Sequence, residues 1–123
     1  MSNINGAVIR YIAAFNETDA GRRRALVAKT WTEDGTYRDP LVAGDGHNGI
    51  SAMIGAIHER FPGYRFRLVS GIDAHNGCVR YRWEAGGAEG SPLYFAGTDF
   101  AVMAEDGRFA SVTGFLDAAP SAT

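Results

Sequence analysis

The stretch LYFAGTDFAVM, residues 93–103, is apolar along almost its whole length and contains a single carboxylate, Asp99. Its aromatic and β-branched residues predict a strand over Pro92–Ala104. Sequences typical of turns flank it, with a glycine-rich run at 86–90 on one side and Glu105-Asp106-Gly107 on the other. The short gaps are of hairpin size, so the neighbouring strands along the chain should be antiparallel to this one.

The second half of the chain continues this pattern in both directions. Alternating apolar residues predict strands at about Tyr64–Asp73, Cys78–Ala85 and Arg108–Asp117. His75-Asn76-Gly77 supplies another turn between the first two of them. Residues 64–117 therefore predict a meandering antiparallel sheet.

The first half has helical periodicity instead. Apolar residues recur with a 3.6-residue period from Ile4 to Phe15, again after Asp19 as far as Asp34, and from Ile50 to Phe61. Thr36–Asp39 is a short strand candidate that Pro40 stops, and 41–49 has the composition of a loop. Three helices followed by a sheet predict an α+β fold with the helices packed on one face. We expect one domain over 1–117 and a disordered tail at 118–123.

Composition excludes several classes of protein. The chain has 123 residues, of which 46% are hydrophobic and 21% are charged, which is the composition of a globular domain. Twelve basic and 14 acidic side chains give a net charge of −2, so nothing favours nucleic acid or a membrane surface as a partner. One cysteine and three dispersed histidines match no metal-site spacing. With no signal-peptide or membrane-span pattern, a cytoplasmic location is expected.

Three polar residues occupy apolar surroundings. Tyr11 lies on the apolar stripe of the first helix, where its hydroxyl needs either a backbone partner or a functional one. Asp39 precedes Pro40 and is either a turn former or a general base at the end of a strand. Asp99 either points to water from an edge strand or is buried, and a buried carboxyl with no basic partner is most economically neutral and hydrogen bonded.

Other polar residues have simpler interpretations. His47, in the loop before the third helix, either faces solvent or lines a pocket. The Arg22-Arg23-Arg24 run is interpreted as a solvated helix face. In Arg80-Tyr81-Arg82-Trp83 the aromatic residues share one face of a strand and the arginines the other, which we expect to be the outer face.

Together, Arg10-Tyr11-Ile12-Ala13-Ala14-Phe15-Asn16, Asp39-Pro40 and Asp99 resemble ketosteroid isomerase, and more broadly the nuclear-transport-factor-like superfamily that includes SnoaL-like polyketide cyclases. Further segments that fit the superfamily are Trp31–Gly35, Gly49-Ile50, Asp106–Phe109 and Gly114–Asp117. The resemblance implies a cone, in which a strongly curved antiparallel sheet wraps around three helices and an apolar pocket opens at one end. It also implies a homodimer.

Carried over residue by residue, the resemblance makes Asp39 the general base, and Tyr11 with a neutral Asp99 the two donors to the substrate oxygen. The leading hypothesis is an enzyme that removes a proton α to a carbonyl of a small hydrophobic substrate, leading to isomerisation or aldol-type cyclisation, without cofactor or metal. Candidate pocket residues are Phe15, Trp31, His47, Phe61, Trp83 and Phe115. One alternative is a non-catalytic ligand-binding or dimerisation module, and another is a hydrolase or dehydratase in which His47 and Asp39 act on water.

Overall fold

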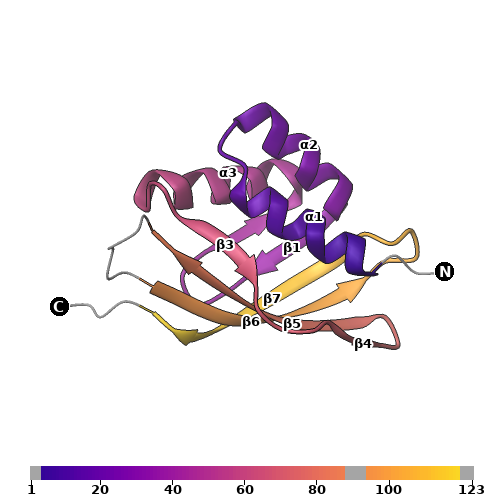
Figure 1. The fold of residues 1–123 in the computed structure, drawn as a ribbon. Coiled ribbons are helices and arrows are strands. Elements are labelled where there is room, and N and C mark those ends of the chain that lie inside the picture. The colour runs from indigo at the N-terminus through magenta and orange to yellow at the C-terminus, as the bar shows by residue number, and fades with distance from the viewer. Residues whose placement is uncertain (1–3, 88–93, 120–123) are drawn as a thin grey trace.

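The structure is a computed structural model that describes residues 4–87 and 94–119. Three helices lie over one face of a seven-stranded sheet (Figure 1). The helices are α1 (Ile4–Asn16), α2 (Ala20–Thr30) and α3 (Gly46–Arg60). The strands are β1 (Trp31–Arg38), β2 (Ala43–Asp45), β3 (Arg65–Leu68), β4 (Asp73–His75), β5 (Cys78–Gly86), β6 (Tyr94–Met103) and β7 (Phe109–Ala118). The α+β prediction is confirmed.

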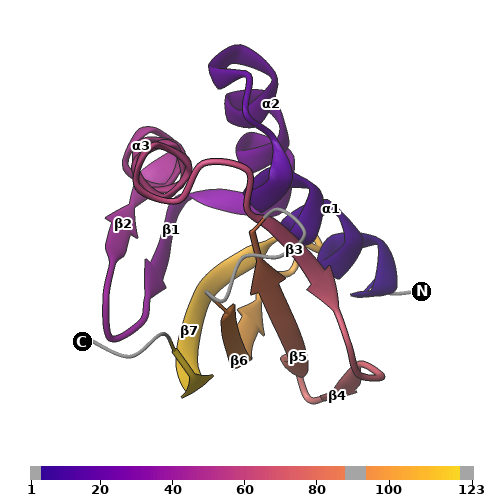
Figure 2. The same ribbon diagram turned by 60° about the vertical axis from the view of Figure 1, so that its left-hand side comes forward.

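The sheet is strongly curved and mixed. Its order is β2-β1-β7-β6-β5-β3, with β4 paired to β5. In Figure 2 the sheet curls so that β1 and β2 rise beside α3. All pairs are antiparallel except β1 with β7, which is parallel, so the prediction of a wholly antiparallel sheet is wrong at this pair. No hairpin connects these two strands, and turn sequences therefore carry no information on their relative direction.

The second helix ends earlier than predicted. Asp19 caps its start by accepting a hydrogen bond from the Arg22 amide at 2.9 Å. At its end the Thr30 hydroxyl bonds the Leu26 carbonyl, and Trp31 is already extended. Trp31 is thus the first residue of β1 rather than part of the apolar stripe of the helix. A tryptophan at helical spacing and one at the start of a buried strand look alike in sequence.

The third helix begins one turn earlier than predicted, at Gly46, so that His47 lies in its first turn and not in a loop. Gly46 has φ +71°, a conformation that favours glycine and that starts the helix directly after β2. The strand predicted at 64–73 divides into β3 and β4, because Ser70 interrupts it and accepts the Arg82 amide at 2.8 Å through its hydroxyl. The predicted tail falls largely outside the described residues, although Ala118 still belongs to β7.

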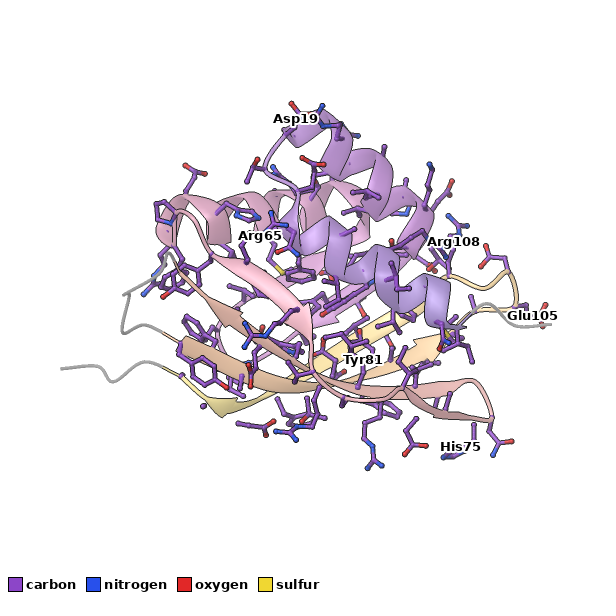
Figure 3. All side chains as sticks on the ribbon, in the orientation of Figure 1. Asp19, Arg65, His75, Tyr81, Glu105 and Arg108 are labelled. Atoms are coloured by element: carbon purple, nitrogen blue, oxygen red, sulfur yellow. The ribbon has the colours of Figure 1, made fainter. Side chains whose placement is uncertain are left out.

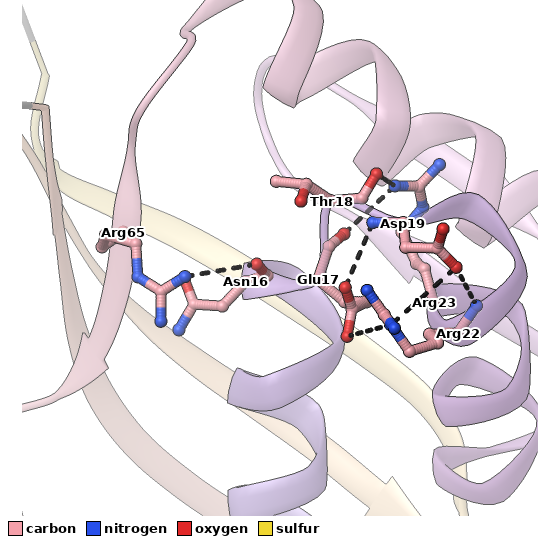
Figure 4. A network of polar contacts seen from close by, with 7 residues as sticks. All are labelled: Asn16, Glu17, Thr18, Asp19, Arg22, Arg23 and Arg65. Carbon is pink, nitrogen blue, oxygen red and sulfur yellow. Dashed lines mark hydrogen bonds and ion pairs between the residues drawn. The ribbon is translucent and has the colours of Figure 1, made fainter.

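The interpretation of the arginine run as solvated is wrong for Arg23, which is only 8% exposed. Its guanidinium donates to the carbonyl of Ser51 on α3 and to that of Glu17 before α2, each at 3.1 Å. Figure 4 shows this side chain reaching the α1–α2 connection, whereas Arg22, whose side chain is 76% exposed, contacts Glu17 and Asp19. Carbonyl acceptors make the burial of this charge tolerable and tie the three helices together.

Candidate active site

A cavity of about 610 Å³ opens between α1, α3 and the concave side of the sheet. Its walls are largely aromatic and aliphatic, and they include the predicted wall residues Phe15, Phe61 and Trp83. Tyr11 and Asp39, two of the three predicted catalytic residues, also line it. The structure thus brings predicted residues from α1, from β5 and from the end of β1 together at one cavity.

Tyr11 and Asp99 form the central polar contact. The Tyr11 hydroxyl lies 2.5 Å from Asp99 Oδ2, although 88 residues separate them along the chain. Asp99 is fully buried in β6, so the alternative of an edge-strand carboxylate facing water is wrong. The alternative of a backbone partner for the Tyr11 hydroxyl is also wrong.

Tyr11 and Asp99 do not both face the cavity. Tyr11 borders the cavity, whereas Asp99 is 0% exposed and lies behind it, outside the cavity lining found among the described residues. The indole nitrogen of Trp83 donates to the second oxygen, Asp99 Oδ1, at 3.0 Å. Asp99 therefore reaches the cavity through Tyr11, and not directly as the resemblance implies.

Burial raises the pKa of Asp99 to about 6, and the hydrogen bonds from Tyr11 and Trp83 oppose that rise. Burial, followed by the nearby Asp99 charge, raises the pKa of Tyr11 well above its usual value. The phenol thus stays protonated, and the proton of the pair can reside on Asp99. When it does, Asp99 donates to the Tyr11 oxygen, and the Tyr11 hydrogen no longer bonds Asp99.

Asp39 is partly exposed and held in a defined orientation just beyond the end of β1. Its Oδ1 accepts the backbone amides of Leu41 and Val42 at 2.7 and 2.9 Å, which makes the Asp-Pro turn. Its Oδ2 accepts the Tyr37 hydroxyl at 2.6 Å. The turn-forming role and a position at the cavity are thus combined in one residue.

Gly114 on β7 lets the acidic groups approach each other. A Cβ at this position would lie 2.9 Å from Asp99 Oδ1, 3.2 Å from Asp39 Cβ and 3.2 Å from the Tyr37 oxygen. The side chains of both acids therefore lie close to Gly114, and a larger residue at this position would clash with them. The Asp39 charge in turn contributes to the raised pKa of Asp99.

Two tyrosines of the site were not singled out by sequence reasoning. Tyr37 is 2% exposed and holds Asp39, and Tyr81 packs edge-on against Tyr11 with ring centroids 5.4 Å apart. Figure 3 shows Tyr81 between the sheet and the helices. Burial, followed by the Asp99 charge, raises the pKa of Tyr81 well above its usual value, and its buried hydroxyl lies close enough to Tyr11 and Asp99 to interact with both. In the sequence, the alternation of Tyr81 with arginines indicates that Tyr81 faces the interior of the sheet.

Three predicted pocket residues lie elsewhere. Trp31 is fully buried in the core, and Phe115 is 58% exposed on the opposite face of the sheet. His47 Nε2 lies 2.7 Å from the Trp31 carbonyl oxygen, and the histidine is not part of the cavity wall in the described chain. The hydrolase or dehydratase hypothesis therefore lacks its histidine.

A second cavity, of about 590 Å³, lies at the other end of the sheet between Arg10 and the turns around His75 and Glu105. Those two turn residues are labelled in Figure 3. No predicted site residue lines it. Within residues 4–87 and 94–119 there is also no group of three or more potential metal-ligating side chains, and no helix has the length and apolarity to cross a membrane.

Fold and cavity together define a class of small α+β domains in which a curved sheet and three helices enclose an apolar hollow. The model of the SnoaL-like domain family matches residues 8–112, and the chain belongs to this family. No curated protein shows significant sequence similarity to it.

Solved structures agree with this assignment. A proposed isomerase of the SnoaL-like family from Agrobacterium tumefaciens is 41% identical, with a TM-score of 0.88 over 96% of this chain and 100% of that one. An NTF2-like protein of unknown function from Exiguobacterium is 18% identical, with a TM-score of 0.72 over 90% and 98% of the chains. A proposed SnoaL-like polyketide cyclase from Jannaschia is 17% identical, with a TM-score of 0.70 over 95% and 90%. The last two show the fold alone.

Proposed function

We propose that the chain is an enzyme that removes a proton α to a carbonyl in a small hydrophobic substrate and stabilises the resulting enolate. Isomerisation and aldol-type cyclisation both begin with this step. The observation that carries the proposal is the presence of Asp39 and the Tyr11–Asp99 pair at one apolar cavity. The family membership and the 41% identical proposed isomerase support it.

Asp39 is the base. Its Oδ1 is held by two backbone amides, which fix the carboxyl plane, and Oδ2 keeps a lone pair beyond the Tyr37 hydrogen bond. A base within hydrogen-bond reach of a substrate C–H contributes typically about 10²–10⁴-fold to the rate. Asp39 accepts the proton on Oδ2 and returns it to another carbon when the reaction is an isomerisation.

Tyr11 is the donor to the substrate oxygen, and Asp99 acts through it. With its proton on Oδ2, Asp99 donates to Tyr11, and Tyr11 donates to the oxygen on which negative charge develops. The indole of Trp83 holds the other oxygen of Asp99. Removing one preorganised donor of this kind typically costs about 10²–10³-fold in rate.

The apolar walls exclude water and so strengthen both interactions. A cavity of about 610 Å³ has room for a bicyclic or larger carbonyl compound. The chemistry described uses only side chains of this chain, and we propose that it needs neither cofactor nor metal.

The test is the isomerisation of β,γ-unsaturated bicyclic ketones to their conjugated isomers, followed by ultraviolet absorbance. We expect Asp39→Asn to reduce kcat by at least about 10²-fold, since the base is lost while the shape is kept. Asp117→Asn is the matched control, because Asp117 is an exposed carboxylate on β7 that accepts the Thr98 hydroxyl and does not line the cavity in the described chain. Equal turnover by wild type and Asp39→Asn would remove the base assignment. Binding of the ketone without turnover would instead favour the non-catalytic binding module.

We also propose that two copies of the chain pair through the outer face of the sheet. Phe100, Val102 and Phe115 are 41%, 37% and 58% exposed there. In the β6–β7 register Phe100 lies opposite Thr113, and Phe115 lies opposite Thr98, so these side chains form one patch. Exposed apolar groups gathered on one sheet face are typical of an interface.

A further inference from the structure

The cavity contains two opposite charges. Among the described residues that line it, Asp39 is the only acid and Arg60 the only base. Arg60 is the last residue of α3, and its side chain forms no ion pair or hydrogen bond with the described part of the chain. Its guanidinium carbon lies 5.5 Å from the centroid of the Phe61 ring.

An aromatic cluster determines where Arg60 lies. Phe61 packs against Tyr64 and Phe95 with centroid distances of 5.2 and 5.1 Å, and all three rings line the cavity. A guanidinium over such a ring is attracted by its π face. Arg60 is exposed and lies at the aromatic rim of the cavity, where its N–H donors are available to a ligand.

Tyr64 supplies a second donor at the same edge. The residue is 5% exposed, and its buried hydroxyl has no hydrogen-bond partner in the described structure. A buried hydroxyl without a partner is costly, and native proteins rarely leave one so. Tyr64 and Arg60 both pack against the ring of Phe61 and both line the cavity, so an unpartnered phenol and a guanidinium belong to the same part of its wall.

We propose that the substrate of this cavity carries an anionic group, most simply a carboxylate, which Arg60 and Tyr64 bind. This inference rests on the proposed function for the reaction, but not for the binding. An anion is attracted to Arg60 and repelled by Asp39, so the charges orient the ligand with its anionic end at the α3 terminus and its carbonyl end toward Asp39 and Tyr11. Charge-assisted hydrogen bonds from a guanidinium are well suited to such a group.

The experiment compares 2-naphthoate with its neutral isostere 2-naphthamide by isothermal titration calorimetry at pH 7.5 and low ionic strength. We expect wild type to bind naphthoate at least about tenfold more tightly, the usual effect of one charge-assisted hydrogen bond. Arg60→Gln should abolish this preference while changing the naphthamide affinity by less than about twofold, because the apolar contacts remain. Tyr64→Phe should reduce the preference for naphthoate in part.

Arg65→Gln is the matched control. Arg65 is an exposed arginine nearby on β3 that reaches the Asn16 carbonyl, as Figure 4 shows, and it does not line the cavity. Equal affinities in wild type, binding of neither ligand, or a preference that survives Arg60→Gln would each overturn the proposal. Asp39→Asn should bind naphthoate at least as well as wild type does, so loss of the base and loss of the anion site are separate outcomes.

Discussion

At the scale of single residues, the site consists of two short chains of hydrogen bonds. Trp83 and Tyr11 hold Asp99 in the interior, while Tyr37 and two backbone amides hold Asp39 at the cavity. The buried acid is neutral at low pH and charged at high pH, and only its neutral form can donate to Tyr11. In the proposed mechanism, the protonation state of Asp99 therefore decides whether the Tyr11 hydroxyl can donate to the substrate oxygen.

The pH dependence of activity tests this arrangement. With a pKa of about 6, Asp99 ionises above that pH, and Tyr11 then donates to Asp99 rather than to the substrate. We expect kcat/KM of wild type to fall as the pH rises through about 6. Asp99→Asn offers an amide N–H to Tyr11 at every pH, so its profile should lack this limb. A descending limb that persists unchanged in Asp99→Asn would contradict the arrangement.

Stability should depend on the same group. The pKa of Asp99 is higher in the folded chain, at about 6, than its usual value of 3.8, so the folded state binds the proton more strongly. Its stabilising effect is then fully present below about pH 4 and is lost as the pH rises through 6. A shift from 3.8 to about 6, at about 1.4 kcal/mol per pKa unit, corresponds to about 3 kcal/mol. The unfolding free energy of wild type should therefore fall by about 3 kcal/mol relative to that of Asp99→Asn across this pH range.

Urea unfolding of both proteins between pH 4 and 8 measures this difference, since titrations common to both cancel. A difference in unfolding free energy that stays constant with pH would show that the pKa of Asp99 is not raised by folding.

At the scale of elements, periodicity predicts the existence of every helix but not all of their ends. The apolar stripe from Ile4 to Phe15 corresponds to α1, which ends one residue later at Asn16. The end of α2 depends instead on the extended backbone of its C-cap, Trp31, and the start of α3 on the positive φ of Gly46. Neither feature leaves much trace in an apolar pattern. His47 was misplaced for this reason.

Candidate site residues were predictable where burial conflicts with chemistry. Asp99 within an apolar strand and Tyr11 on an apolar helix stripe are polar groups that need partners, and the structure joins them. Tyr37 and Tyr81 raised no such conflict, because a tyrosine in a strand is ordinary. Long-range pairings such as β1 with β7 depend on how the sheet closes, which local sequence does not encode.

Gly97 in β6 tests how closely the strand packs at the site. A Cβ there would lie 2.5 Å from the Trp83 ring and 2.7 Å from the Phe115 carbonyl oxygen. Gly97→Ala should therefore lower the unfolding free energy by about 1–3 kcal/mol, the usual cost of overpacking. Gly86→Ala is the control, because an added Cβ on that strand glycine meets nothing within 4 Å. Equal stabilities of the two variants would show that β6 can shift freely.

At the scale of the whole molecule, the two faces of the sheet differ in what they present. The concave face and the helices enclose the cavity, and the outer face presents the patch around Phe100 and Phe115. Pairing through that patch would leave the cavity open to ligand, because the two surfaces lie on opposite sides of the sheet.

Light scattering after size exclusion tests this pairing. We expect wild type to have twice the mass of one chain and Phe115→Arg to be a monomer, because an arginine cannot be buried there without a partner. Ile9→Arg is the control, since Ile9 is 64% exposed on α1, away from the sheet. A monomeric wild type, or a Phe115→Arg variant that still pairs, would contradict the proposed interface.

The proposed function requires that Asp39 removes a carbon-bound proton inside the cavity. Its most direct test is the exchange of the α-hydrogens of 2-tetralone in D2O, followed by proton NMR with wild type, Asp39→Asn and Asp117→Asn. We expect wild type and Asp117→Asn to exchange these hydrogens well above the buffer rate, and Asp39→Asn to exchange them at the buffer rate. Exchange by Asp39→Asn as fast as by wild type would contradict the claim, as would a wild-type rate no higher than that of buffer with the cavity occupied.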